Sequence, residues 1–141
     1  MTTTKRTLSF SKRGFSPETM MWIFTRLSAL AMYALMLAGV VGALIVSAQT
    51  HTNLANVLRW AFFANSSPNP LSGMPWIAVF AKLMVMAFML VVSSHGVHGI
   101  VEVWDDYMRN RFPRRIFLNI IIVIFAVSNL VVAYVLFFAA K

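Results

Sequence analysis

Three long apolar runs constrain the fold of this chain more than any other feature. They cover residues 27–48, 83–101 and 116–140, and none of them contains Asp, Glu, Lys or Arg. Each is close to the ~20 residues that an α-helix needs to cross the hydrocarbon core of a bilayer. Helices of a soluble bundle would show a polar stripe about every 3.6 residues, and the second and third runs show none. The sequence therefore predicts an all-α membrane protein with three transmembrane helices, over about residues 22–48, 76–104 and 116–140.

The composition excludes an ordinary soluble domain. The chain of 141 residues is 60% hydrophobic and only 11% charged, against about 25% charged residues in soluble domains. The net charge of +8 could suggest nucleic acid, but the cationic residues flank the apolar runs. That placement favours membrane lipid as the environment and no nucleic-acid partner. The chain contains no cysteine, so it cannot supply thiolate ligands to a metal ion or an iron–sulfur cluster.

The positive charges also predict how the helices are oriented. Four cations precede the first predicted span, which starts near residue 22, and four lie between the second and third runs, whereas the connection over residues 49–75 holds one, Arg59. The two groups are Lys5, Arg6, Lys12 and Arg13, and then Arg109, Arg111, Arg114 and Arg115. By the positive-inside rule, we expect the N-terminus and the 105–115 loop in the cytoplasm.

The domain organisation is simple. Residues 1–20 form a polar, basic segment without an apolar core of its own, so it is not a secretory signal. Because the sequence starts at Met1, we expect an uncleaved chain in a bacterial inner membrane, with residues 21–141 as one anchor domain. Residues 53–65 mix apolar and polar side chains and predict an interfacial helix, which residues 66–70 end. Pro113 is expected in a sharp turn before the third run.

His95 is the most informative residue of the second run. Ionisable groups at membrane depth are costly and usually functional, and a buried imidazole is a good ligand for a metal or a haem iron. Gly99 lies one helical turn away and, with Gly96, lets a flat ring or a neighbouring helix come close. Two interpretations stay open: His95 ligates a haem beside these glycines, or it hydrogen-bonds a neighbouring helix that packs on them.

A haem held by two histidines would need a second chain. His98 cannot be the other axial ligand, because side chains three residues apart project from one side of a helix. His51 lies in the outer connection, at the wrong depth. This chain would therefore be half of such a site, and we interpret His98 as a hydrogen-bonded packing residue.

Polar residues near the cytoplasmic interface form a second group of candidates. Tyr107 is expected at the water boundary, where Tyr and Trp commonly form a belt. The adjacent Asp105 and Asp106 add carboxylates, and a phenol with a carboxylate could hydrogen-bond a quinone carbonyl and supply protons. Arg26, at the start of the first run, either anchors the helix by snorkelling or pairs with an anion such as a haem propionate. Glu102 either relays protons or snorkels to the interface.

These residues resemble the D-type membrane anchor subunit of succinate dehydrogenase (succinate:quinone oxidoreductase, respiratory complex II). The second run carries the pattern H-x3-G-x6-D-Y as His95, Gly99, Asp106 and Tyr107. The first begins with Trp22-x3-Arg26-x-Ser28, and the three-span architecture covers essentially the whole chain. Ala29 stands where such anchors often have Gly. C-type anchors tend to carry Arg-His where this chain has Val101 and Glu102, which favours the D-type.

The resemblance implies a non-catalytic subunit of an enzyme, half of a heterodimeric helical anchor bundle. His95 would be an axial ligand of haem b near Gly99 and Arg26, and a C-type anchor subunit would supply the other ligand. Tyr107, Asp106 and Arg26 would bind the quinone. FAD and iron–sulfur clusters would belong to a flavoprotein subunit and an iron–sulfur subunit docked on the cytoplasmic face. Electrons would pass from succinate through these groups to quinone, and this chain would perform no succinate chemistry.

Other functions stay open beside this one. Fumarate reductases share the architecture and work in the reverse direction. In a non-redox structural subunit or an assembly factor without haem, His95 and His98 would be helix-packing residues. A small transporter is disfavoured, because the spans hold one intramembrane acid, Glu102, and no broken helix.

Overall fold

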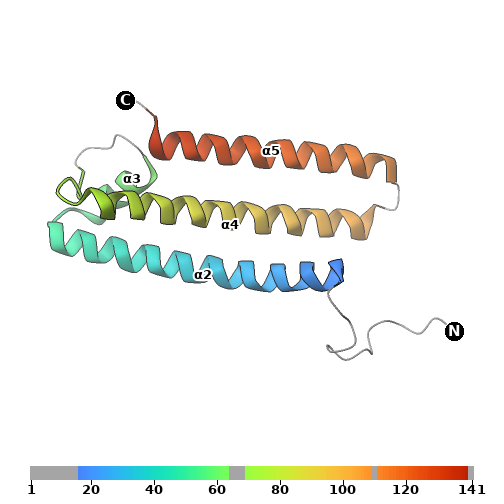
Figure 1. The fold of residues 1–141 in the computed structure, drawn as a ribbon, viewed down its shortest axis with the longest axis horizontal. Helices are drawn as coiled ribbons and strands as arrows, with labels where there is room; N and C mark the ends of the chain where they lie inside the picture. The colour runs from blue at the N-terminus through green and yellow to red at the C-terminus, as the bar shows by residue number, and fades with distance from the viewer. Residues whose placement is uncertain (1–15, 64–68, 109–110, 140–141) are drawn as a thin grey trace.

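The computed structural model describes residues 16–63, 69–108 and 111–139, and this part of the chain is helical without strands (Figure 1). The helices are α2 (Pro17–Thr50), α3 (Leu54–Phe62), α4 (Pro75–Tyr107) and α5 (Arg111–Phe137). Helices α2, α4 and α5 are each long and apolar enough to cross a membrane. The predicted fold class, all-α with three long apolar helices, is confirmed.

The three long helices lie side by side in one flat layer, with α4 in the middle (Figure 1). Helices α2 and α5 both pack on α4. Large apolar side chains are exposed along all three helices, as at Leu30, Leu90 and Leu130. Such an apolar surface needs lipid or a partner protein to cover it, because exposing an apolar patch of this extent to water is unfavourable. The structure is therefore that of a multi-pass membrane protein whose layer leaves both of its faces uncovered.

Helix α2 extends beyond the predicted span at both ends. It starts after Ser16, whose hydroxyl accepts a hydrogen bond from the backbone N–H of Thr19 at 3.2 Å, with Pro17 in the first turn. These are a strong N-cap and a favoured first helical residue. The helix ends at His51, which adopts a left-handed conformation (φ 51°). A left-handed residue at this position is a common way to end a helix.

Helix α4 matches the thickness of a bilayer with its headgroup regions. Trp76 and Tyr107 lie near its two ends, and each side chain is 85% exposed. At 1.5 Å per residue they are about 46 Å apart along the helix axis, close to the 40–45 Å of a bilayer with both interfaces. Aromatic residues prefer these interfaces, so the two rings mark the expected water boundaries.

Helix α3 closes one end of the layer and confirms the helix expected over residues 53–65. Asn53 caps it, accepting a hydrogen bond from the backbone N–H of Ala55 at 2.9 Å. Val57 and Trp60 of α3 are buried together with Leu71 and Leu136 in the main apolar core of the described residues. A partly open apolar cavity of about 450 Å³ lies beneath α3, between α2 and α4.

The opposite end of the layer is closed by the turn between α4 and α5. Asp105 accepts two hydrogen bonds from Arg114, from Nε at 2.6 Å and from Nη2 at 2.7 Å. One residue earlier, Trp104 stacks on Phe117 with ring centroids 3.9 Å apart. Pro113 was expected in the turn but lies in the first turn of α5, where a missing N–H costs no helical hydrogen bond.

Lys82 of α4 ties α3 to the layer. Its ammonium donates hydrogen bonds to the backbone carbonyls of Trp60 and Phe63, both at 3.0 Å, and lies 4.9 Å from the centre of the Trp60 ring. Carbonyls in the last turn of a helix lack intrahelical partners, and a cation there also complements the helix dipole. Lys82 therefore caps the C-terminus of α3 from a neighbouring helix.

Replacing Lys82 with Met should loosen α3 without unfolding the three long helices. The variant loses two charge-assisted hydrogen bonds, so we expect the free energy needed to detach α3 from the layer to fall by about 1–3 kcal/mol. Hydrogen–deuterium exchange at the α3 amides measures this, with exchange in the middle of α4 as the internal reference. Lys82→Arg keeps a cation at this position and should exchange nearly like the wild type. Equal α3 exchange in Lys82→Met and wild type would contradict the capping role.

Candidate functional site

Two polar side-chain pairs join α2 to α4 near the end of the layer opposite α3. Ser28 Oγ lies 2.8 Å from His95 Nδ1, and Thr25 Oγ1 lies 2.6 Å from His98 Nε2. Ser28 and His98 are each 8% exposed. On α2, Thr25 and Ser28 are three residues apart, and on α4 so are His95 and His98. The two pairs are therefore stacked about one helical turn from each other. We call them the Ser28–His95 rung and the Thr25–His98 rung.

The hydrogens of the first rung assign the tautomer of His95. The Ser28 hydroxyl donates to the backbone carbonyl of Thr25 at 3.2 Å. A hydroxyl has one hydrogen to donate, so His95 Nδ1–H must be the donor if both contacts are hydrogen bonds. This arrangement makes one more hydrogen bond than the alternative, a gain of about 1 kcal/mol. The Nε2 atom of His95 then carries a lone pair and is available as a ligand.

The second rung gives His98 the opposite tautomer. The Thr25 hydroxyl donates to the backbone carbonyl of Met21 at 2.9 Å, so His98 Nε2–H donates to Thr25 Oγ1. The same nitrogen lies 3.5 Å from Glu102 Oε1, and Phe24 packs edge-on against the ring. Since Nε2 of His98 is engaged by Thr25 of α2 and the side chain is buried, this nitrogen is not available to bind a metal. This arrangement agrees with the interpretation of His98 as a packing residue.

The half of α4 that runs from residue 92 to residue 107 has one broad face that packs on neither α2 nor α5. At 100° per residue, seven positions of this half fall within an arc of about 120°. All seven are exposed, and we call this arc the open face: Val92, Gly96, Gly99, Ile100, Val103, Asp106 and Tyr107. His95 lies at its border, about 60° around the helix from His98. A Cβ atom built on Gly96 or Gly99 would meet nothing within 4 Å.

The open face excludes one role for the two glycines, close packing against another described helix of this chain. No helix of this chain packs on Gly96 or Gly99 among the described residues, because the space beside them is open. Whatever occupies that space comes from outside the described residues, as a cofactor, a lipid or another polypeptide. His95 and the two glycines therefore lie close together on α4, at a place that the described part of the chain leaves uncovered.

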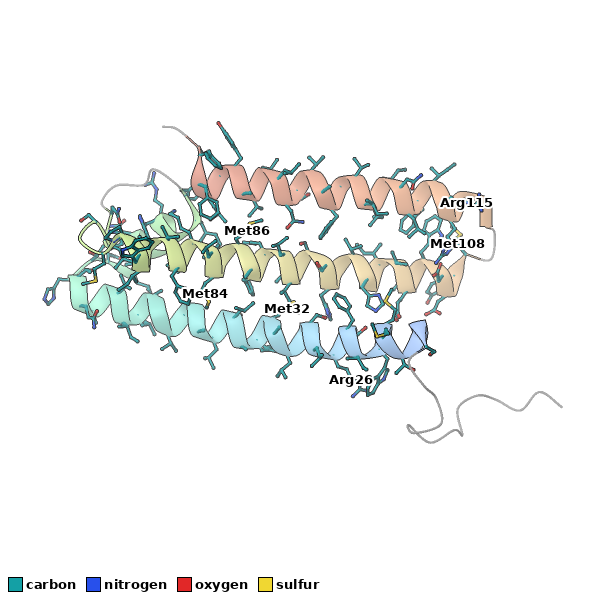
Figure 2. The ribbon with its side chains drawn as sticks, in the orientation of Figure 1. Arg26, Met32, Met84, Met86, Met108 and Arg115 are labelled. Atoms are coloured by element: carbon teal, nitrogen blue, oxygen red, sulfur yellow. The ribbon has the colours of Figure 1, made fainter. Side chains whose placement is uncertain are left out.

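Arg26 lies away from this place. Its guanidinium stacks on the Trp22 ring, 4.2 Å from the ring centre, and the side chain projects from the edge of α2 opposite α4 (Figure 2). Around α2 it is about 160° from Ser28. The structure therefore does not bring Arg26 to His95, although both lie in the same half of the layer.

The structure separates the two acids at the end of α4. Asp105 is held by Arg114 in the turn, whereas Asp106 and Tyr107 are exposed on the open face. Tyr107 is about 18 Å along the helix from His95. Of the two carboxylates next to Tyr107, only Asp106 shares the open face with the phenol, so only Asp106 can contact the same external molecule as Tyr107.

A complete metal centre is not assembled within residues 16–63, 69–108 and 111–139. No three His, Asp or Glu side chains gather there as a metal site would require. A haem iron needs only one protein ligand on each side of the ring. His95 fits one side through Nε2, because the contact with Ser28 uses its other ring nitrogen, Nδ1. Ser28 enters the sequence analysis only as part of a motif, and Thr25 does not enter it. The signal for both is a pair of hydroxyls three residues apart at the start of the first predicted span, matching two histidines three residues apart in the second.

Comparison with known proteins gives no match for this chain: no family model, no curated protein and no solved structure matches it. Its function has to be inferred from the rungs, the open face and the two ends of the layer.

Proposed function

We propose that this chain is the D-type membrane anchor subunit of a succinate:quinone oxidoreductase. It would bind haem b together with a second anchor subunit and form part of the quinone-reduction site. The observation that carries the proposal is the position of His95, which contacts Ser28 through Nδ1 and lies at the border of the open face beside exposed Gly96 and Gly99. An imidazole nitrogen next to a surface without side chains suits the edge of a flat porphyrin.

The flat layer supports a site shared with another chain. Helices α2 and α5 flank α4 but leave the open face uncovered (Figure 1). His95 can ligate from one side only, and His98 is held by Thr25. The second histidine would come from a C-type anchor subunit packed on the open face. When bound, the haem would supply one-electron redox chemistry within the membrane.

The exposed end of α4 supports the quinone role. A phenol donates a hydrogen bond well to a quinone carbonyl, and a nearby carboxylate can deliver a proton from water. Tyr107 and Asp106 offer these groups at the water boundary. The iron–sulfur and flavoprotein subunits, with their clusters and FAD, would dock at this end and carry out succinate oxidation. Arg26 would join the haem or quinone site only if the partner brings those groups to the outer edge of α2.

Replacing His95 with Ala should remove the b-type haem from the purified complex. The reason is loss of one of two axial ligands, which the described residues of this chain do not replace. Reduced-minus-oxidised spectra and haem content per complex measure the effect. His98→Gln and His51→Ala are matched controls and should retain haem, because His98 Nε2 is engaged by Thr25 and His51 ends α2 at the opposite end of the layer. An unchanged bis-histidine spectrum in His95→Ala would overturn the assignment.

Replacing Tyr107 with Phe should slow quinone reduction by about 100-fold or more, the lower end of what a positioned proton donor contributes. Succinate oxidation with a soluble artificial acceptor should stay at the wild-type rate, because that chemistry occurs on other subunits. Tyr134→Phe is the control, since this tyrosine is also exposed but lies on α5 towards the α3 end. Equal loss of both activities in Tyr107→Phe would show that the tyrosine acts on assembly instead of on quinone.

The orientation in a bacterial inner membrane can be tested with single cysteines, because the chain has none. Ser72 and Met108 are exposed in the connections at opposite ends of the layer. In intact spheroplasts we expect a membrane-impermeant maleimide to label Ser72→Cys and to spare Met108→Cys. After permeabilisation both should react. Labelling of Met108→Cys alone in intact spheroplasts would reverse the orientation that the positive charges predict.

A further inference from the structure

We propose that Ser28 is a positioning residue that fixes the tautomer and ring orientation of His95 and thereby lowers the reduction potential of the iron that His95 binds. The proposal rests on the proposed function and deepens it, because it assigns the control of the haem to a hydroxyl on a different helix. The observation behind it is the 2.8 Å contact between Ser28 Oγ and His95 Nδ1, at a hydroxyl that is 8% exposed.

A hydroxyl is well suited to this role at membrane depth. Metal-ligating histidines usually donate their second N–H to a carboxylate, a carbonyl or water, which fixes the ring and makes the ligating nitrogen a stronger donor. A carboxylate would be costly inside the hydrocarbon region. Ser28 is a neutral acceptor, and its burial between α2 and α4 limits competition from water.

The Ser28 hydroxyl is itself held in place. It donates to the carbonyl of Thr25 at 3.2 Å, which directs its oxygen lone pairs towards His95. The three groups form a hydrogen-bond chain from the imidazole through the hydroxyl to the α2 backbone, and such chains polarise their members. Electron density is thereby pushed towards His95 Nε2, which favours ferric over ferrous iron.

The neighbouring rung provides a built-in control. Thr25 makes a similar contact, at 2.6 Å, but to the Nε2 atom of His98. Replacing the Thr25 side chain with Val removes this contact and leaves the Thr25 carbonyl that accepts from Ser28. Both substitutions remove one hydroxyl from the same face of α2, so general loosening of the α2–α4 contact should affect them alike. Only the loss of the Ser28 hydroxyl should change the reduction potential of the iron.

The first test is redox titration of the haem in the purified membrane complex. We expect Ser28→Ala to retain His95-ligated haem and to shift its midpoint potential to more positive values. A tenfold change in the preference for ferric iron corresponds to about 59 mV for one electron. The low-spin electron paramagnetic resonance signal should shift too, because the imidazole is no longer held in orientation. Ser28→Thr, which keeps a hydroxyl, should restore the wild-type potential, and Thr25→Val should not change it.

The second test does not need haem. In the full-length chain reconstituted in lipid with ¹⁵N-labelled histidine, the signals of His95 should show a protonated Nδ1 and an unprotonated Nε2. His51→Gln and His98→Gln variants assign the three histidines. A protonated Nε2 on His95 overturns the proposal, and this result can be obtained even if the Ser28→Ala complex fails to assemble.

The outcomes separate this proposal from the function on which it rests. Haem present with the same potential and resonance signal in Ser28→Ala and wild type overturns the role of Ser28 alone. An equal shift in Thr25→Val also overturns it, because the effect would then be one of packing. A purified wild-type complex without haem overturns the proposed function and the tuning of its iron, whatever the tautomer of His95.

Discussion

Hydrogen bonding between helices in a solvent without water is the constraint on which this structure depends. In lipid, apolar side chains gain little by leaving the acyl chains for one another, so packing and polar contacts must hold the helices together. Between α2 and α4 the polar contacts are the two rungs, at Ser28–His95 and Thr25–His98. Between α4 and α5, the Asn129 amide donates to Ser93 at 3.2 Å, and the turn adds the pair between Asp105 and Arg114. Each long-helix contact thus has its own small set of directional bonds.

The same bonds create the chemical difference between the two histidines. A histidine that only held helices together could satisfy the rung with either nitrogen. His95 contacts α2 through Nδ1 and lies at the border of the open face, whereas His98 contacts α2 through Nε2 and is buried. Under the proposed function, the ring atom that each hydroxyl of α2 meets decides which histidine can bind the iron, and this depends on the rotation of α2 against α4.

The three long helices could be predicted from the sequence because an apolar run of about 20 residues matches the length and the apolar environment of a membrane span. The positions of His95, Asp106 and Tyr107 followed from helical periodicity along α4. Contacts between helices could not be predicted in this way, since runs without a polar stripe do not encode rotation or register. The ammonium of Lys82 caps α3, and nothing in the residues around position 82 indicates that contact. The amide of Asn129 bonds to Ser93 of α4, a pairing that the apolar run around it does not specify either.

The two ends of the layer differ in which of their side chains are engaged within the chain. At the α3 end, Trp60 and Leu136 are buried and the Lys82 ammonium is bonded to two carbonyls. At the other end lie Met108 and Arg115 (Figure 2), both exposed, and the exposed Tyr107. The α3 end also has exposed side chains, Arg59 and Trp76, so exposure alone does not separate the two ends. Under the proposed function, a water-soluble partner would bind at the end with the phenol of Tyr107, and a membrane partner along the open face that leads to it.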